Sequence, residues 1–381
     1  IRYKPTLKIS LLKKREEKLE KISQEFRKTN QLSNKIVYIG TGGTIMSRID
    51  YETGAVKPSF KIEDLLELLP EVKEKAEVKM YELFKIFSED ITIEHWSKLA
   101  EAIYEEFKNN ATSVIIAHGT DTLGYTSAAL SFALQNLPNP VILLGAQRSL
   151  DRPSSDSYLN LYSAFKYALE GKYAGVFVIM HGSSSDDYCS LHLGTKVRKF
   201  HTSRRDAFKS INIIPVAKIY LDKIIYEYTE GLKERKEERE IYLFNKFSNK
   251  VFLLKFFPNI SGDIIYYLVD KGYRGIVIEG TGLGHVSHNL FESIKYAIDK
   301  GVIVVMTSQC IFGRVNMYVY ETGRNLLRLG VISAEDMLPE TALVKLMWVL
   351  GNFKDLEESK KIFLTNIAGE ISKRTLYEGY L

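Results

Sequence analysis

Residues 113–130 read SVIIAHGTDTLGYTSAAL, a short apolar run that ends in glycine and continues into a segment typical of a helix. Parallel sheets are built from such pairs of a strand and a helix. The same order opens the main part of the chain, where KIVYIG (35–40) runs into TGGTIMS (41–47). Ligands bind beyond the carboxyl ends of parallel strands. We therefore expect the Thr and Asp side chains of both stretches to meet in one cleft.

Strands and helices alternate along most of the remaining sequence. Further β-rich runs lie at 140–147, 174–180, 250–257, 275–280 and 302–308, and helices are predicted over 123–136 and 157–169. The stretch GLKERKEERE (231–240) has the composition of an exposed linker. The sequence therefore predicts an α/β fold of two domains with mostly parallel sheets. The expected boundaries are 35–221 for the first domain, 222–249 for the linker, 250–356 for a smaller second domain and 357–381 for a C-terminal extension.

The amino-acid composition indicates an ordinary globular protein. The chain has 381 residues, of which 45% are hydrophobic and 26% charged, an ordinary globular balance. No apolar run reaches the roughly twenty residues of a membrane helix. Its two cysteines, Cys189 and Cys310, form no disulfide framework or zinc motif. We expect a cytoplasmic protein without a zinc site, and the scarcity of glutamine suggests a thermophilic source.

The net charge of +5 is concentrated at the start of the chain. Residues 1–30 hold ten Lys/Arg and four Asp/Glu, so the rest of the chain is close to neutral. The stretch LLKKREEKLEKISQEFRK (11–28) has apolar residues at helical spacing. It is either a solvated connector or a contact for RNA or a partner. Because the chain begins with Ile1, we expect residues upstream of it.

Glycine-rich turns can belong to a nucleotide site, a metal site or a catalytic site, and the sequence does not support these three equally. A dinucleotide fingerprint needs a third glycine where Ile45 and His285 stand in GTGGTI and GTGLGH, and no P-loop is present. The seven histidines show no metal-ligand spacing. Capping of the following helix by Thr120, Asp121 or Thr122 is the structural alternative for HGTDT. The functional alternative is a threonine amidohydrolase, in which a hydroxyl attacks an amide carbon and backbone N–H groups stabilise the oxyanion.

The motifs IGTGGTI and AHGTDT resemble, in order and spacing, the two signatures of the bacterial-type asparaginase/glutaminase family. The similarity extends over about residues 35–355. It implies that Thr44 is the nucleophile and that Tyr51 belongs to a mobile lid. It also implies that Thr120 and its neighbour Asp121 act with a lysine, which counting back from Phe208 identifies as Lys199 rather than Lys196. Which threonine carries the covalent intermediate stays open.

The resemblance also implies a set of substrate contacts. They are Ser88 and Glu89, where the family has Ser-Gln, the backbone of Gly43, the backbone carbonyl of Ala146, and Asp121 for the α-amino group. Lys199 is expected either to lose its charge on burial or to stay charged beside Asp121 and polarise Thr120. The loop GTGLGH departs from the family because Leu283 stands where other members have a polar residue that binds substrate across a dimer.

Longer stretches resemble one branch of the family, the D-type subunit of the archaeal glutamyl-tRNA(Gln) amidotransferases. These stretches include AQRSLDRPSSDSYLNL (146–161) and MLPETALVKLMWVLGN (337–352). The branch implies that residues 1–34 are the end of a small N-terminal β domain and a basic helical connector. It also implies that the chain itself has no cofactor. Ammonia from Gln or Asn would pass to a transamidase/kinase subunit (the E-type subunit), which uses ATP and Mg on Glu-tRNA(Gln), within a heterotetramer built on a homodimer.

Two alternatives to this function remain. One is a free-standing cytosolic L-asparaginase, which shares the chemistry but usually lacks an extension before the first strand. The other is a catalytically silent binding scaffold. The complete set Thr44, Tyr51, Thr120, Asp121 and Lys199 argues against the scaffold, since binding alone does not require all five side chains.

Overall fold

The computed structural model describes residues 34–375 apart from Thr44, Met46, 50–55, 59–68 and 150–151. The predicted N-terminal β domain and connector therefore lie outside the described residues, except for Asn34. So do Thr44 and Tyr51. Within the described part, no helix is both long and apolar enough to cross a bilayer.

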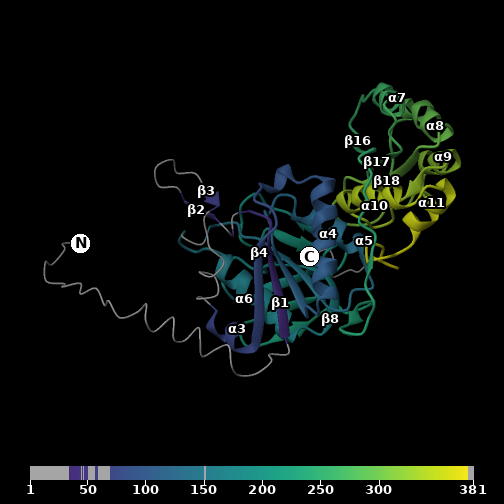
Figure 1. Ribbon diagram of the computed structural model, residues 1–381. Coiled ribbons are helices and arrows are strands. Elements are labelled where there is room, and N and C mark those ends of the chain that lie inside the picture. Colours follow the sequence, from purple (N-terminus) through teal and green to yellow (C-terminus); the bar gives the residue numbers. More distant parts are fainter. Residues whose placement is uncertain are drawn as a thin grey trace, which may run out of the picture. The chain divides into compact units, whose positions relative to one another are not determined.

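A predominantly parallel sheet forms the centre of the first half of the chain (Figure 1). Its parallel strands, in sheet order, are β8 (Tyr173–His181), β7 (Pro140–Leu144), β5 (Ser113–Ala117), β1 (Asn34–Gly40) and β4 (Ala76–Glu82). Beyond β8 the sheet continues through antiparallel β9 (Cys189–Leu193), β12 (Ala217–Ile219) and β13 (Ile224–Tyr226). The prediction of a mostly parallel α/β fold is confirmed.

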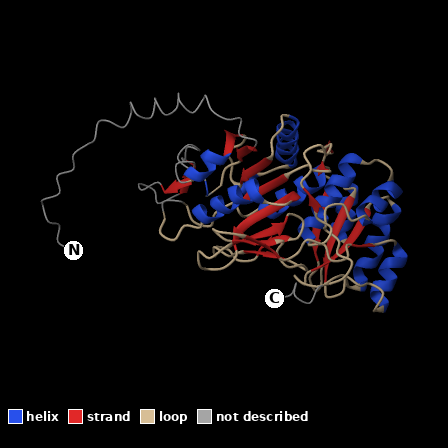
Figure 2. Ribbon diagram, turned by 90° about the horizontal axis from the view of Figure 1, so that it is seen from below, coloured by secondary structure: helices blue, strands red, loops and turns tan. Residues whose placement is uncertain are grey.

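Helices cover both faces of this sheet (Figures 1 and 2). One face packs against α4 (Ile93–Lys108) and α5 (Leu123–Ala133), the other against α3 (Pro70–Lys75) and α6 (Ser157–Glu170). Strand β1 supplies both cores, because its alternate side chains point to opposite faces. Val37 and Ile39 belong to the first core, whereas Ile36 and Tyr38 belong to the second. Burial on both faces explains why the strands read as continuous apolar runs.

A second, smaller parallel sheet follows. Its strands, in sheet order, are β16 (Val251–Lys255), β17 (Gly275–Gly280), β18 (Ile303–Ser308) and β19 (Ile332–Ser333). Its helices are α7 (Asp263–Asp270), α8 (Phe291–Asp299), α9 (Glu321–Leu329), α10 (Pro339–Asn352) and α11 (Leu356–Leu364). Helix α10 packs on α5 of the first half, where Trp348 stacks on Phe132 with ring centroids 5.8 Å apart. The two halves therefore share one apolar core.

The remaining elements are short. They are β2 (Ser47–Ile49), β3 (Val56–Pro58), η2 (Ser88–Asp90), β6 (Leu134–Gln135), β10 (Val197–Lys199), β11 (Phe208–Ser210), β14 (Lys233–Glu234), β15 (Tyr242–Leu243) and η3 (His288–Leu290). Among them β14 pairs with β8 at the large sheet, whereas β2 pairs with β3, β6 with β15 and β10 with β11.

Two segments differ from the sequence-based expectation. The helix predicted to reach Asn136 ends at Ala133, because the next two residues pair with β15 and Asn136 adopts a left-handed conformation with φ of 57°. The segment expected to be a linker carries β13, β14 and β15. Each of them pairs with a strand of the first half of the chain.

Candidate active site

The two glycine-rich motifs start side by side. Strands β1 and β5 are parallel neighbours, and their last paired residues are Gly40 and Ala117. Just beyond, both the backbone N–H and the hydroxyl of Thr41 donate to the carbonyl oxygen of Ala117, at 3.0 and 2.8 Å. Strand pairing therefore brings TGGT and HGTDT to the same edge of the sheet.

Glycines let the two motifs touch backbone to backbone. A Cβ on Gly43, whose φ is +91°, would lie 2.6 Å from the backbone nitrogen of Gly119. A Cβ on Gly42, whose φ is +107°, would collide with the carbonyl oxygen of Ile86. Both a left-handed backbone and the absence of a side chain are therefore needed here. This close approach explains the paired glycines of TGGT without a phosphate ligand.

The side chains of Thr120, Asp121 and Lys199 form a connected cluster at this edge. The Lys199 ammonium donates to Oγ1 of Thr120 at 2.8 Å and to Oδ1 of Asp121 at 2.7 Å. Thr120 is buried and the Lys199 side chain is 15% exposed, whereas that of Asp121 is 67% exposed. The cluster thus joins a buried hydroxyl to a carboxylate that faces solvent.

Lys199 reaches this cluster from the end of β10, where it pairs with Phe208 of β11. Lys196, three residues earlier, is fully buried and binds Asp336 instead. The structure therefore brings Lys199, not Lys196, to Thr120 and Asp121.

The FSED segment packs against the second motif. Ser88 is buried, and a Cβ on Gly119 would lie 2.7 Å from the Cβ of Ser88. Thr122 occupies the N-cap position of α5, yet its hydroxyl donates to the carbonyl oxygen of Ser88 at 2.6 Å and makes no cap bond. The helix-capping interpretation of Thr122 is therefore wrong. Glu89, next to Ser88, is exposed.

The loop after β7 packs against Thr120. Ala146 is buried, and the backbone N–H groups of Gln147 and Arg148 donate to the buried carboxylate of Asp156 at 2.9 to 3.1 Å. A Cβ on Gly145 would lie 2.8 Å from Cγ2 of Thr120. Asp156 was not among the predicted site residues, although its place in the polar run RPSSDS ahead of a helix is a signal for a carboxylate that fixes a loop.

His118 directly follows β5, two positions before Thr120. It is fully buried, and its Nδ1 lies 2.7 Å from the carbonyl oxygen of Gly119. Burial lowers the pKa of His118 to about 4. The ring is therefore neutral at pH 7, and its role is to support the turn that carries Thr120.

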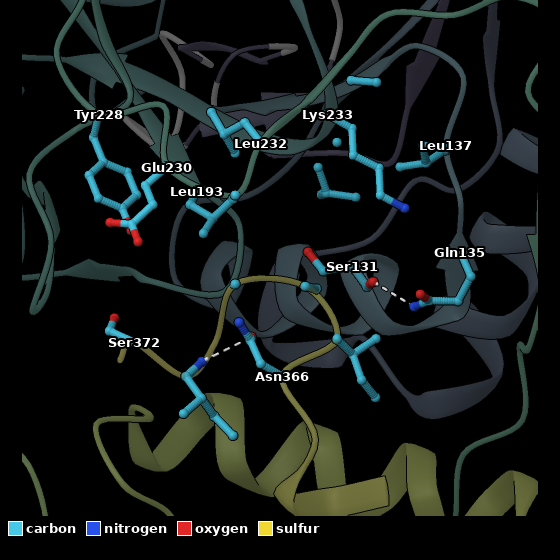
Figure 3. Close-up of a pocket in the computed structure, with 18 of the residues that line it drawn as sticks. Ser131, Gln135, Leu137, Leu193, Tyr228, Glu230, Leu232, Lys233, Asn366 and Ser372 are labelled. Carbon is cyan, nitrogen blue, oxygen red and sulfur yellow. Dashed lines mark hydrogen bonds between the residues drawn. The ribbon is translucent and has the colours of Figure 1, made fainter. Parts of the chain in front are cut away.

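The described residues also form a cavity apart from this cluster. A cavity of about 690 Å³ lies between the end of α5, β14 and residues 366–374 (Figure 3), and none of Thr120, Asp121 and Lys199 lines it. No group of three His, Cys, Asp or Glu side chains in the described part is arranged to hold a metal ion. Leu283 is half-buried, and its carbonyl oxygen accepts the N–H of Asn316.

Comparisons with known proteins identify the family of the chain. Residues 35–231 match the family "Asparaginase, N-terminal", and residues 250–363 match "Glutaminase/Asparaginase C-terminal domain". The chain is 57% identical over 340 residues to the D-type subunit of the glutamyl-tRNA(Gln) amidotransferase of Pyrococcus furiosus, covering 89% of this chain and 77% of that protein. It is 50% identical to the corresponding D-type subunit of Metallosphaera sedula, covering 97% of this chain and 83% of that protein.

Solved structures give the same family. The thermostable L-asparaginase from Thermococcus kodakarensis matches with a TM-score of 0.80 and 33% identity, covering 89% of this chain and 100% of that one. L-asparaginase I from Vibrio cholerae matches with a TM-score of 0.78 and 29% identity, covering 89% and 99%. The chain therefore belongs to the asparaginase family and, within it, to the branch formed by the D-type subunits of the glutamyl-tRNA(Gln) amidotransferases.

Proposed function

We propose that the chain hydrolyses the side-chain amide of Gln or Asn and supplies the ammonia for converting Glu-tRNA(Gln) to Gln-tRNA(Gln). One observation carries the hydrolytic part of this proposal: the Lys199 ammonium bonds at once to the Thr120 hydroxyl and the Asp121 carboxylate. The use of the ammonia is supported by high identity to D-type subunits of this amidotransferase.

In the proposed reaction a threonine oxygen attacks the amide carbon and forms an acyl-enzyme ester. Thr44, which follows Gly43, is the first candidate for the nucleophile. The C–N bond breaks when the amide nitrogen takes up a proton and leaves as ammonia. Water then hydrolyses the ester. Backbone N–H groups of the glycine-rich turn stabilise the oxyanion of each step.

Lys199 and Thr120 have a joint role in moving the proton. An ammonium N–H donated to Oγ1 of Thr120 stabilises negative charge on that oxygen. In the first step Thr120 gives its own hydroxyl proton to the leaving amide nitrogen and takes the Thr44 proton in exchange. In the second step it takes a proton from the attacking water and gives its own to the departing Thr44 oxygen. Asp121 holds the ammonium in place from the solvent side.

The substrate's charged groups are assigned by complementarity. Glu89 and Asp121 carry exposed carboxylates, which suit the α-amino group. The backbone of Ser88 and Gly43 suits the α-carboxylate end, and the carbonyl of Ala146 suits the N–H groups of the amide. Glu in place of the family's Gln at position 89 makes this site more acidic.

The partner is proposed to be the transamidase/kinase subunit of the same amidotransferase, which carries ATP and Mg and presents Glu-tRNA(Gln). This chain would need no cofactor of its own, and it would act in the cytoplasm as a homodimer within a heterotetramer. An ammonia supplier that is coupled to its acceptor should be weakly active alone. A coupling free energy of about 1–3 kcal/mol corresponds to a roughly 5- to 150-fold rise in rate.

The test is ammonia release from Gln by the chain alone, with the transamidase/kinase subunit, and with that partner plus Glu-tRNA(Gln), ATP and Mg. The proposal predicts a rise at each addition and formation of Gln-tRNA(Gln) in the complete mixture. A second candidate, a free-standing L-asparaginase, is favoured by the match to the whole of the Thermococcus kodakarensis enzyme. A full rate with Asn from the isolated chain, unchanged by partner and tRNA, would select it.

A further inference from the structure

Side chains from the second half of the chain bind the segment that contains β10 and Lys199. The Lys196 ammonium, directly before β10, donates to Oδ2 of Asp336 at 2.7 Å and to its carbonyl oxygen at 3.2 Å. Both side chains have no exposed surface. Asp336 lies between β19 and α10, so this ion pair joins the two halves.

Two flanking contacts reinforce the same junction. The hydroxyl of Thr341, in the first turn of α10, donates to the carbonyl oxygen of Thr195 at 2.9 Å. Arg198 pairs with Glu340 at 3.1 Å. Residues 195, 196 and 198 are therefore all tied to residues 336–341.

Lys199 faces the other way. Alternate residues of a strand point to opposite sides, so the strand that turns Arg198 toward α10 turns Lys199 toward Thr120 and Asp121. On that side, a Cβ on Gly124 of α5 would lie 3.2 Å from the carbonyl oxygen of Val197. Strand β10 thus lies between the first turn of α5 and the first turn of α10.

Asp336 is itself fixed by several partners. Its Oδ1 accepts the backbone N–H of Ser372 at 2.9 Å, and its carbonyl oxygen accepts Nδ2 of Asn212 at 3.0 Å. Arg314 lies 3.7 Å from the same carboxylate. A buried carboxylate with this many partners has one stable position, which suits it to define the position of a neighbouring strand.

We propose that the Lys196–Asp336 pair positions β10 so that the Lys199 ammonium reaches Thr120. The proposal rests on the proposed function of Lys199, and Lys196 and Asp336 are positioning residues that touch no substrate. It makes the placement of the C-terminal half part of the catalytic geometry. It also gives a reason for a buried ion pair here, since such pairs contribute little net stability compared with apolar side chains.

The chain contains a matched control pair. Lys345 and Glu370 also have no exposed surface, Lys345 also donates to a backbone carbonyl, and Glu370 also accepts N–H groups from the C-terminal segment. In the part of the chain that is described, neither residue bonds to residues 196–199. Glu370 does act on Lys196 through its charge, since burial lowers the pKa of Lys196 and the Glu370 carboxylate raises it against that effect. Replacing either pair by apolar side chains removes one buried ion pair, but only the Lys196–Asp336 replacement removes the hydrogen bonds that hold Lys196.

The experiment compares the double variants Lys196→Met/Asp336→Leu and Lys345→Met/Glu370→Leu in the complex with the partner subunit. At a temperature where both are folded, we expect the first to lose about 30-fold or more in kcat, with KM changed less than about threefold. We expect the second to keep kcat within about threefold. In a crystal structure of the first, Lys199 Nζ should lie farther than about 3.5 Å from Thr120 Oγ1. Asp336→Asn, which keeps the side-chain shape, takes its place if the double variant does not fold, with the same expected split between kcat and KM.

Equal kcat for both double variants would overturn the proposal and leave the pair a structural one. Lys199→Met, measured in parallel, separates the two proposals. An active Lys199→Met variant refutes the proposed function of Lys199. An inactive Lys199→Met beside a fully active Lys196→Met/Asp336→Leu refutes only the positioning role.

Discussion

The ammonium nitrogen of Lys199 lies 2.8 Å from the hydroxyl oxygen of Thr120, 79 positions earlier in the chain. The bond links β10 to the turn between β5 and α5. Because the lysine can only donate, the threonine oxygen must accept this hydrogen bond, which leaves the threonine's own proton available for transfer. The proposed chemistry depends on this relationship.

The first prediction concerns the hydroxyl of Thr120. Thr120→Ala should reduce ammonia release from Gln by about 10³-fold or more, because the lysine loses the oxygen through which it acts. Thr120→Ser keeps that oxygen and should retain activity within about tenfold. The control is Thr122→Ala, which removes only the bond to Ser88 and should cost about 1 kcal/mol of stability. Similar rates for Thr120→Ala and Thr122→Ala in steady-state assays would be inconsistent with the mechanism.

The second prediction concerns the contact between the glycine-rich motifs. Gly43→Ala should lower the free energy of unfolding by about 3 kcal/mol or more, since the new Cβ meets Gly119 and the backbone is left-handed. Gly272→Ala shares the positive φ, at +75°, but has open space around it, and it should cost only about 1 kcal/mol. Urea denaturation of both variants measures the difference. Equal losses of unfolding free energy in the two variants would mean that the two motifs leave room for a Cβ at Gly43.

Much of this arrangement could be predicted from sequence because parallel strands deliver their following turns to one edge. The meeting of TGGT with HGTDT follows from that rule, and the family resemblance added the lysine. The partner of Lys196 could not be predicted, because Asp336 lies 140 positions away with no pattern joining them. The hydrogen bond from the Thr122 hydroxyl to the carbonyl oxygen of Ser88 could not be predicted either. This tertiary contact takes the place of the helix-capping bond that the residue type favours locally. The strands inside the charged segment 222–249 were missed because edge pairing needs few apolar side chains.

The third prediction concerns Glu89. Glu89→Gln should raise KM for Gln by about threefold to fivefold and leave kcat unchanged, because an exposed carboxylate contributes about 0.5–1 kcal/mol to binding a cationic group. The increase should shrink in high salt, where exposed charges are screened. Asp90→Asn, an exposed neighbour, is the control and should change neither constant. An unchanged KM for Glu89→Gln at low salt would remove Glu89 from the binding site.

The fourth prediction concerns acid stability. The pKa of His118 falls from 6.5 to about 4 on burial. Between these two pH values, the unfolded chain therefore binds a proton at His118 that the folded chain does not bind. The contribution of the neutral His118 ring to the free energy of unfolding is fully present above pH 6.5. It is lost as the pH falls toward 4, by about 3 kcal/mol in total. Denaturation curves at pH 7 and pH 4 should therefore differ less in His118→Asn than in wild type.

The exposed His288 provides the control for replacing a histidine, and His288→Asn should change the free energy of unfolding at pH 7 by less than about 0.5 kcal/mol. Part of the acid sensitivity should persist in His118→Asn, because burial also lowers the pKa of His192 to about 3. Identical pH dependence in wild type and His118→Asn would contradict the assignment.

The most direct test of the account is the rate of ammonia release from Gln by Lys199→Met, in complex with the partner subunit and beside the wild-type complex. Methionine keeps an unbranched side chain, one heavy atom shorter than lysine, and removes its three N–H donors. The account predicts a rate about 10³-fold or more below wild type, with an unchanged circular dichroism spectrum and an intact complex. A folded, assembled Lys199→Met enzyme that releases ammonia within about tenfold of the wild-type rate would contradict it.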